Sequence, residues 1–185
     1  MMTAKKLNLG CGTDIRSGWV NLDKYDLPGV EVVHDLEVLP LPFSDHSFDE
    51  ILCQDILEHV AYPVLLKELY RILKKEGVLK IRVPHFTSKN NFIDPTHQKM
   101  FSVRTFYFFV TDHGFKKYHR KYYFDFSFRK ITSLRITFEG SSRFFFYNRF
   151  IEWVVNRSED TQYLYEATGF SRIFPAENIE ITLIK

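Results

Sequence analysis

The chain has 185 residues, of which 45% are hydrophobic and 26% are charged, and its formal net charge is +2. These proportions are typical of one folded domain and exclude a disordered chain. No apolar run approaches the ~18 residues of a membrane-spanning helix, and the first residues show no secretory signal. The two cysteines, Cys11 and Cys53, have neither metal-binding nor redox spacing, so we expect a reduced, cytoplasmic protein.

The net charge is near zero because a basic middle segment offsets two acidic segments on either side of it. Residues 86–150 hold 20 of the 31 aromatic residues, with 12 Lys and Arg against 4 Asp and Glu. Residues 1–85 and 151–185 each carry a net charge of −3. We therefore expect one domain, residues 1–185, with three parts: a first half, a basic and aromatic middle segment, and a closing segment made of a helix and the last strand.

Short apolar runs in the first half predict strands at 6–9, 19–22, 30–34, 48–53 and 78–83. Residues 61–75 have apolar positions at helical spacing, with Pro63 in the first turn, and predict a helix that Gly77 ends. In the second half, 101–110 fits a helix or a strand, while the patterns predict a strand at 128–138, a helix at 143–155 and the last strand at 178–185. This alternation indicates an α/β fold with a mostly parallel sheet.

Glycine or aspartate residues follow three successive predicted strands. Gly10 and Gly12 flank Cys11 directly after the first strand, Asp23 ends the second, and Asp35 follows the third. In open α/β sheets, ligands bind outside the carboxyl ends of the strands. Glycine lets the backbone approach a ligand closely, and a carboxylate can accept hydrogen bonds from both hydroxyls of a ribose. The order of these residues therefore predicts a nucleoside-shaped site.

Five motifs follow one another along the first half of the chain: LNLGCG (7–12), VNLD (20–23), DLEVLPLPF (35–43), SFDEI (47–51) and DILEHV (55–60). With these motifs in this order, the chain resembles class I S-adenosylmethionine-dependent methyltransferases of the type 11 branch. The resemblance covers residues 5–84, which makes 1–85 the cofactor-binding half. It implies a Rossmann-like sheet flanked by helices, and S-adenosylmethionine as the cofactor.

The resemblance also implies roles for individual residues. In that family, Asp23 would hold the ribose hydroxyls, Asp35 would accept from the adenine amine, and Gln54 and Asp55 would lie under the sulfonium. The full set that the resemblance places around the cofactor is Leu9, Gly10, Cys11, Gly12, Asp23, Asp35, Leu36, Gln54 and Asp55.

The loop after the first strand departs from the family pattern. Asp14 stands where a third glycine is usual, and only residues 13–18 separate the glycine turn from the next strand. A parallel crossover normally needs about a dozen residues, so we expect the first crossover helix to be shortened or absent. The missing Gly-x-Gly-x-x-Gly fingerprint also counts against an NAD-dependent oxidoreductase.

Three histidines are candidates for a catalytic base: His59, His85 and His97. Asp55, Glu58 and His59 have helical spacing, which some methyltransferases use to bind a divalent ion, and His85 could supply a fourth ligand. The same Glu-His pair is common in the family without metal. We therefore expect no metal, and a contact from Glu58 or His59 to the substrate instead.

The basic, aromatic middle segment has three interpretations. Its rings pack a core, form a cap over the methyl donor with cationic groups for an anionic substrate, or bind nucleic acid through the Lys and Tyr cluster at 116–123. The pI of about 8.4 gives nucleic acid little support, and we expect an aromatic-rich cap in the second half. The expected function is methyl transfer from S-adenosylmethionine to a small-molecule acceptor, anionic or linked to carbohydrate or lipid. The alternative is an inactive Rossmann-like domain that binds nucleic acid or a protein partner.

Overall fold

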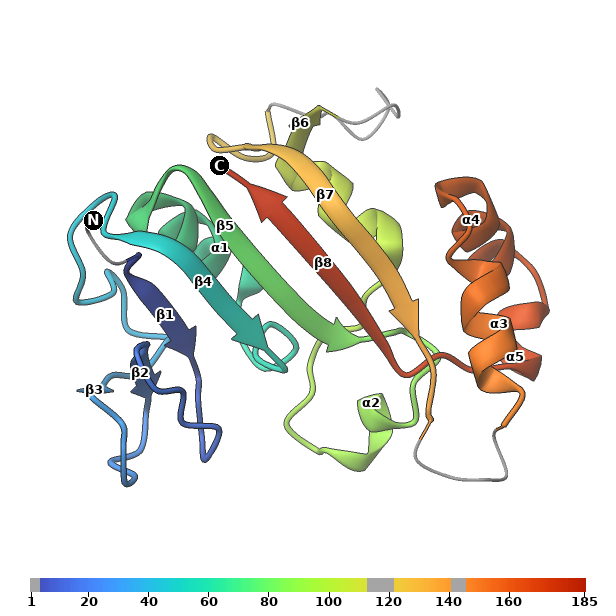
Figure 1. Cartoon of the computed structure of the whole chain (residues 1–185), viewed down its shortest axis with the longest axis horizontal. Coiled ribbons are helices and arrows are strands. Elements are labelled where there is room, and N and C mark those ends of the chain that lie inside the picture. Colours follow the sequence, from blue (N-terminus) through green and yellow to red (C-terminus); the bar gives the residue numbers. More distant parts are fainter. Residues whose placement is uncertain (1–3, 113–121, 141–145) are drawn as a thin grey trace.

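The computed structural model describes residues 4–112, 122–140 and 146–185, which form one eight-stranded sheet with helices behind it and at one edge (Figure 1). Along the chain the strands are β1 (Lys6–Leu9), β2 (Val20–Asp23), β3 (Val32–Val33), β4 (Phe48–Gln54), β5 (Leu73–Pro84), β6 (Val110–Asp112), β7 (Phe128–Thr137) and β8 (Asn178–Ile184). The helices are α1 (Tyr62–Ile72), α2 (Asn90–Ile93), the 3₁₀ helix η1 (Val103–Phe109), α3 (Asn148–Val155), α4 (Glu159–Ala167) and α5 (Phe170–Ile173).

The sheet has the order β3-β2-β1-β4-β5-β8-β7-β6. Strands β1 to β5 are parallel and follow the 3-2-1-4-5 order of doubly wound folds. Strand β8 runs antiparallel between β5 and β7, and β6 pairs with β7 in parallel. The expected α/β fold with a mostly parallel sheet is therefore confirmed.

The predicted strands are present, but β5 begins at Leu73 rather than Val78, and the first helix ends earlier than predicted. Helix α1 ends at Ile72 rather than Lys75, because Leu73 already pairs with Phe48 of β4. The left-handed residue of this connection is Glu76, with a φ of 62°, and not the expected Gly77. The ambiguous segment 101–110 is a 3₁₀ helix that leads into strand β6.

The first crossover contains no helix. Residues 10–19, between β1 and β2, form turns, which confirms the expected loss of the first crossover helix. Two buried amides hold this loop instead. The Asn8 side-chain amide donates to the carbonyl of Asp14 (2.7 Å), and the Asn21 amide oxygen accepts from the backbone N–H of Arg16 (3.0 Å). The connection from β2 to β3 also lacks a helix.

Helices α1 and η1 cover one face of the sheet, behind it in Figure 1. Helix α1 buries Leu65, Leu66, Leu69 and Ile72 there. The aromatic cluster of the middle segment is present, and most of its buried rings fill this same core rather than lie over a cleft. The buried Phe rings of the middle segment in this core are Phe101, Phe106, Phe109, Phe126 and Phe128. The Lys cluster at 116–121 lies outside the described residues.

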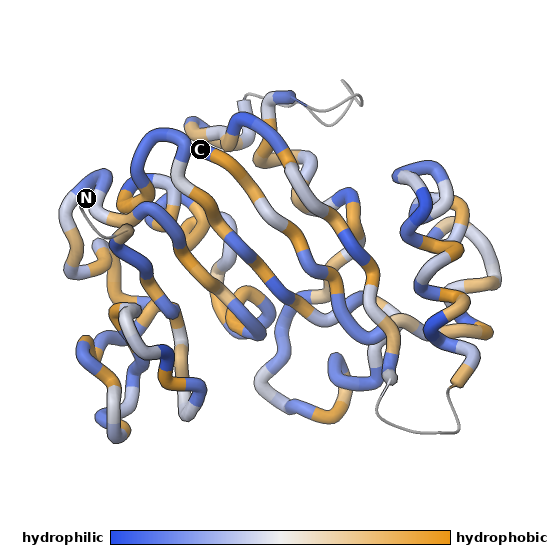
Figure 2. The backbone as a smooth tube through the Cα atoms, viewed as in Figure 1, coloured by the Kyte–Doolittle hydropathy of each residue, from blue (hydrophilic) through white to orange (hydrophobic). Residues whose placement is uncertain are grey.

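The opposite face, which points toward the viewer in Figure 1, has no helix of the described chain over β4, β5 and β8. Parallel sheets are usually covered on both faces, and here charged side chains replace the missing cover. Glu50 of β4 forms ion pairs with Lys6 (2.9 Å) and Lys80 (2.6 Å). Polar and apolar residues alternate along these strands (Figure 2), as expected for a sheet with one wet face.

Helices α3 and α4 lie beside strand β7 at the edge of the sheet (Figure 1). The Asn156 amide, just after α3, donates to the carbonyl of Ile136 (2.7 Å) and accepts from its N–H (2.8 Å). Gln162 of α4 donates to the carbonyl of Leu134 (2.9 Å). These bonds satisfy backbone groups in the part of β7 that β6 does not pair, which would otherwise be open. Within the described residues, every helix is too short or too polar to cross a membrane.

Candidate functional site

A cleft of about 500 Å³ opens at the carboxyl ends of β1 and β2. We call it the donor cleft. Its lining brings together six of the nine residues that the sequence places around a cofactor: Gly10, Gly12, Asp23, Asp35, Leu36 and Asp55. This volume lies in the range of small-molecule sites.

The glycine turn and Asp23 form one end of the donor cleft. Gly10 and Gly12 have φ values of 62° and 49°, which favour glycine. The Asp23 carboxylate accepts from the N–H of Gly12 (2.8 Å) and of Tyr25 (3.0 Å). A carboxylate has about four acceptor positions, so Asp23 can still accept from two hydroxyls. A Cβ atom on Gly12 would meet nothing within 4 Å, which leaves open space beside this turn.

The other end of the donor cleft has an apolar wall. Leu36, Ile56 and Val60 line it, and Asp35 lies at its rim with an exposed side chain. One Asp35 oxygen accepts from the N–H of Glu37 (2.9 Å), which leaves further acceptor positions. A flat apolar ring with an amine at its edge fits this end, and a ribose fits the Asp23 end. The residues therefore suit a nucleoside cofactor.

Three expected cofactor residues do not line the donor cleft. Leu9 and Cys11 are buried in the sheet, and the backbone N–H of Cys11 donates to the carbonyl of Leu22 (2.9 Å). Burial raises the pKa of the Cys11 thiol. The Gln54 amide oxygen accepts from Arg16 (3.2 Å), and Gln54 is not among the residues that line the donor cleft.

A second cleft, of about 560 Å³, adjoins the donor cleft beyond the ends of β4 and β5. We call it the acceptor cleft. Asp55 and His59 line both clefts and so mark the junction between them. The other residues that line the acceptor cleft are Glu58, Arg82, Pro84, Asn90, Ile93, Asp94, His97, Glu177 and Asn178.

Asp55 at the junction is fixed by Arg82. The residue has a φ of 54°, and its backbone N–H donates to the carbonyl of Arg82 (2.9 Å). The guanidinium donates to both carboxylate oxygens, with Nε 3.0 Å from Oδ1 and a second bond from Nη2 to Oδ2. This hydrogen bond raises the pKa of Arg82. The Arg82 charge is therefore already paired within the cleft.

His59 has a defined tautomer. The Thr96 hydroxyl lies 2.6 Å from Asp94 Oδ1 and 2.8 Å from His59 Nδ1. Because the carboxylate takes the only hydroxyl proton, the hydroxyl accepts from Nδ1–H of the imidazole. The second ring nitrogen, Nε2, is then unprotonated. Burial, with a smaller contribution from the charge of nearby His97, lowers the pKa of His59.

The three candidate histidines separate in the structure. His97 lies with His59 in the acceptor cleft, and their ring centroids are 4.6 Å apart. His85 is completely buried and lines neither cleft. Its Nδ1 bonds to Thr87 (2.7 Å) and its Nε2 to Glu166 (3.2 Å) of α4. Both ring nitrogens are thus used inside the fold, so the expectation of a catalytic base or metal ligand at His85 is not supported.

Carboxylates dominate the acceptor cleft. Four of its residues are acidic, Asp55, Glu58, Asp94 and Glu177, against the paired Arg82. Burial raises the pKa of the Glu58 carboxyl to about 8. Asp94 and Glu177 keep the cleft acidic even when Glu58 is protonated and Asp55 is paired with Arg82, and this lining does not favour the anionic acceptor that the basic middle segment suggested. Asp94, Arg82 and Glu177 also line this cleft and were not predicted as site residues.

Comparison with known proteins supports the resemblance seen in the sequence. Residues 3–81 match the family model described as a methyltransferase domain. An uncharacterized protein of Methanocaldococcus jannaschii is 50% identical over 46 residues, which are 25% of this chain and 20% of that relative. The match thus spans a fifth of the relative's length.

Solved structures of similar fold cover almost the whole chain. A SAM-dependent methyltransferase from Archaeoglobus fulgidus superposes with a TM-score of 0.57 at 19% identity, over 99% of this chain and 87% of that one. Another from Thermotoga maritima has a TM-score of 0.58 at 19% identity, over 100% and 84%. These likenesses show the methyltransferase fold. Together with the domain match, they support S-adenosylmethionine as the cofactor.

Proposed function

We propose that this chain, a class I S-adenosylmethionine-dependent methyltransferase, transfers a methyl group at the junction of its two clefts to a small polar acceptor. The observation that carries the proposal is the shared lining: Asp55 and His59 belong to the donor cleft and to the acceptor cleft. A methyl group at this junction is within reach of a nucleophile in the acceptor cleft without crossing bulk solvent. When bound, the cofactor supplies an electrophilic methyl group on a sulfonium.

The chain's own residues hold the two reactants in line. The glycine turn and Asp23 would bind the methionine and ribose parts of the cofactor, and Asp35 with Leu36 would bind the adenine. Alignment of this kind supplies a large part of the rate in a displacement reaction. The acceptor binds among Glu58, Asp94 and His97 on the other side of the junction. The acidic lining favours an acceptor that is neutral or positively charged.

His59 and His97 are the groups placed to activate the acceptor. His59 presents an unprotonated Nε2 at the junction, because Thr96 fixes the proton on Nδ1. A hydroxyl or ammonium acceptor must lose a proton before or during methyl transfer. His97, from the chain segment after α2, faces the same cleft. The two histidines would therefore act as bases toward acceptors whose nucleophile is protonated at the start of the reaction.

Calorimetry with S-adenosylmethionine tests the donor side directly. We expect one site per chain. Asp23→Ala should weaken binding by at least ~100-fold, since two hydrogen bonds to a charged group each contribute about 1.5–3 kcal/mol. Asp26→Ala is the matched control, because Asp26 is exposed and does not line the donor cleft; this variant should bind like the wild type.

Turnover is tested with a panel of hydroxyl and amine acceptors by following formation of S-adenosylhomocysteine. A neutral or cationic acceptor should give product, and His59→Gln should slow it. Absence of cofactor binding at millimolar concentration would exclude the proposed function. Binding without product from any acceptor class would favour the inactive domain instead.

A further inference from the structure

The acceptor cleft contains a buried carboxylate with no hydrogen-bond partner. Glu58 is completely buried, and neither of its oxygens bonds to another group of the described residues. The His97 side chain is only 8% exposed, and its Nδ1 is likewise without a hydrogen bond there. An unpaired buried carboxylate is costly, so native proteins rarely keep one without a ligand.

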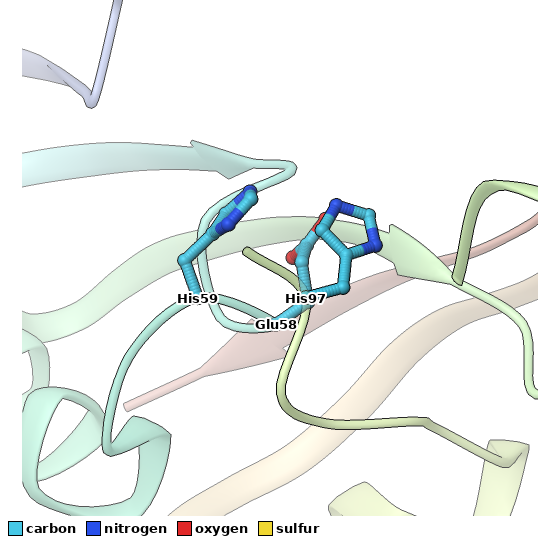
Figure 3. A group of neighbouring side chains, drawn as sticks. All are labelled: Glu58, His59 and His97. Carbon is cyan, nitrogen blue, oxygen red and sulfur yellow. The ribbon is translucent and has the colours of Figure 1, made fainter. Parts of the chain in front are cut away.

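Glu58 lies next to two imidazoles that come from different parts of the chain. Glu58 and His59 follow β4, and His97 follows α2; Figure 3 shows the two rings side by side with the carboxylate next to His97. One ligand atom from each of the three residues lies within 4.8 Å of the others. Tetrahedral ligands bound at about 2.0–2.2 Å lie roughly 3.4 Å from one another. The three side chains would therefore rotate toward one another to hold one ion.

Pairing within the protein does not satisfy these groups. His97 Nε2 is 3.9 Å from Glu58 Oε1 and 3.8 Å from Asp94 Oδ2. Both distances are too long for hydrogen bonds. Asp55 and Asp94 add negative charge around the same point, and the one arginine of the cleft is paired with Asp55. Within the described residues, no hydrogen-bond donor therefore reaches the carboxyl group of Glu58.

We propose that Glu58, His59 and His97 bind a divalent transition-metal cation at the junction of the donor and acceptor clefts. One carboxylate and two imidazoles form a ligand set that suits borderline ions such as Zn²⁺ or Co²⁺, with positions left open for a substrate. The Thr96 hydroxyl already holds His59 by Nδ1–H, so Nε2 is the nitrogen that ligates. A hydrogen bond of this kind is the usual partner of a metal-bound histidine. His85, bonded to Glu166 and Thr87, is not part of the set.

The cation would take part in the proposed methyl transfer. Binding of the cation does not depend on that function, whereas its part in the reaction does. With the cation bound, His59 and His97 act as ligands instead of bases. An acceptor hydroxyl that binds the cation through its oxygen then has a lowered pKa and releases its proton to solvent. The oxygen electron pair then forms the bond to the methyl carbon. The bond from that carbon to sulfur breaks, and its electron pair stays on sulfur. The step changes no oxidation state of the metal, and it selects hydroxyl acceptors.

Cobalt spectroscopy on the full chain tests the site without any cofactor or acceptor. After treatment with EDTA and dialysis, Co²⁺ is added and its visible absorption is followed. We expect one Co²⁺ per chain, displaced by Zn²⁺. Glu58→Gln and His97→Gln each remove a ligand of the cation. Each should weaken Co²⁺ binding by more than ~10–100-fold, which is the loss when only a hydrogen-bond partner of a ligand is removed. His34→Gln is the control, because the His34 ring bonds to the carbonyl of Val38, outside both clefts.

Thermal melting of the metal-free proteins separates a ligand role from a structural one. Glu58→Gln should melt no lower than the wild type, because the carboxylate that it replaces has no partner to lose. Wild-type binding of Co²⁺ by Glu58→Gln and His97→Gln, or no binding by the wild type at millimolar Co²⁺, would overturn the proposal. Cofactor affinity is measured separately, so failure of the metal site and failure of the methyltransferase function give different results.

Discussion

The donor cleft and the acceptor cleft are assembled from the chain in different ways. The donor cleft comes mainly from residues 10–60, at the ends of successive parallel strands. The acceptor cleft combines the turn after β4, the end of β5, the segment 90–97 and the start of β8 near Asn178. A nucleoside site can therefore be carried by a short stretch of sequence, whereas the site for the variable substrate depends on tertiary placement.

The largest effect is expected from the glycine turn of the donor cleft. A Cβ atom at Gly10 would lie 2.1 Å from Ile56 Cδ1, and the φ of 62° is itself unfavourable for alanine. Gly10→Ala should lower the free energy of unfolding by about 2–4 kcal/mol, from left-handed strain and overpacking together. Chemical denaturation measures this loss.

Gly140 provides the matched control. A Cβ atom there meets no atom of the described residues within 4 Å, and its φ is not in the left-handed range. Gly140→Ala should leave stability unchanged or slightly higher. Equal losses at Gly10 and Gly140 would contradict the view that the donor turn is a constrained part of the site.

The next largest difference in stability is expected between substitutions of His85, which is buried, and His97, which lines the acceptor cleft. His85 uses both ring nitrogens inside the fold, so His85→Ala should lower stability by about 2–3 kcal/mol through lost bonds and a cavity. His97 has no such bonds in the described structure at Nδ1. His97→Ala should therefore cost less than His85→Ala, although truncation of this largely buried ring also leaves a cavity. A larger loss at His97 than at His85 would show that the roles of the two residues are reversed.

The smallest effect is expected at Arg82, which lines the acceptor cleft but not the donor cleft. Arg82 forms an ion pair with Asp55, and both side chains are more than a third exposed, at 35% and 45%. Arg82→Gln should therefore change stability by at most about 1 kcal/mol. Calorimetry should give cofactor affinity within ~3-fold of the wild type, since the backbone of Asp55 keeps its bond to the carbonyl of residue 82. A larger loss would mean that the two clefts are not separate sites.

Much of the fold and part of the donor cleft could be predicted from the sequence. Apolar runs of four to seven residues mark the central strands, and Gly12 and Asp23 lie at strand ends, where ligands bind in parallel sheets. The short spacing at 13–18 correctly predicted a crossover without a helix. These features depend on local sequence, so a single chain is enough to find them.

Other features depend on contacts between distant residues, and the sequence did not reveal them. The rings of Phe101, Phe106 and Phe128 look the same in a core or in a cap, and only packing against α1 places them in the core. The sequence around His85 and His97 does not show that their surroundings differ. The first is buried against Glu166, 81 residues away, and the second is brought to Glu58 by the segment after α2. Gln54 follows the family pattern, yet the shortened first loop brings Arg16 to its side chain.

A crystal structure with S-adenosylhomocysteine tests the central claim most directly, namely that the donor cleft presents a methyl group to the acceptor cleft at Asp55 and His59. The account predicts the ribose hydroxyls on Asp23, the adenine beside Leu36 and Asp35, and the sulfur directed toward the junction. A ligand bound elsewhere, or one in the donor cleft with its sulfur turned away from His59, would contradict it.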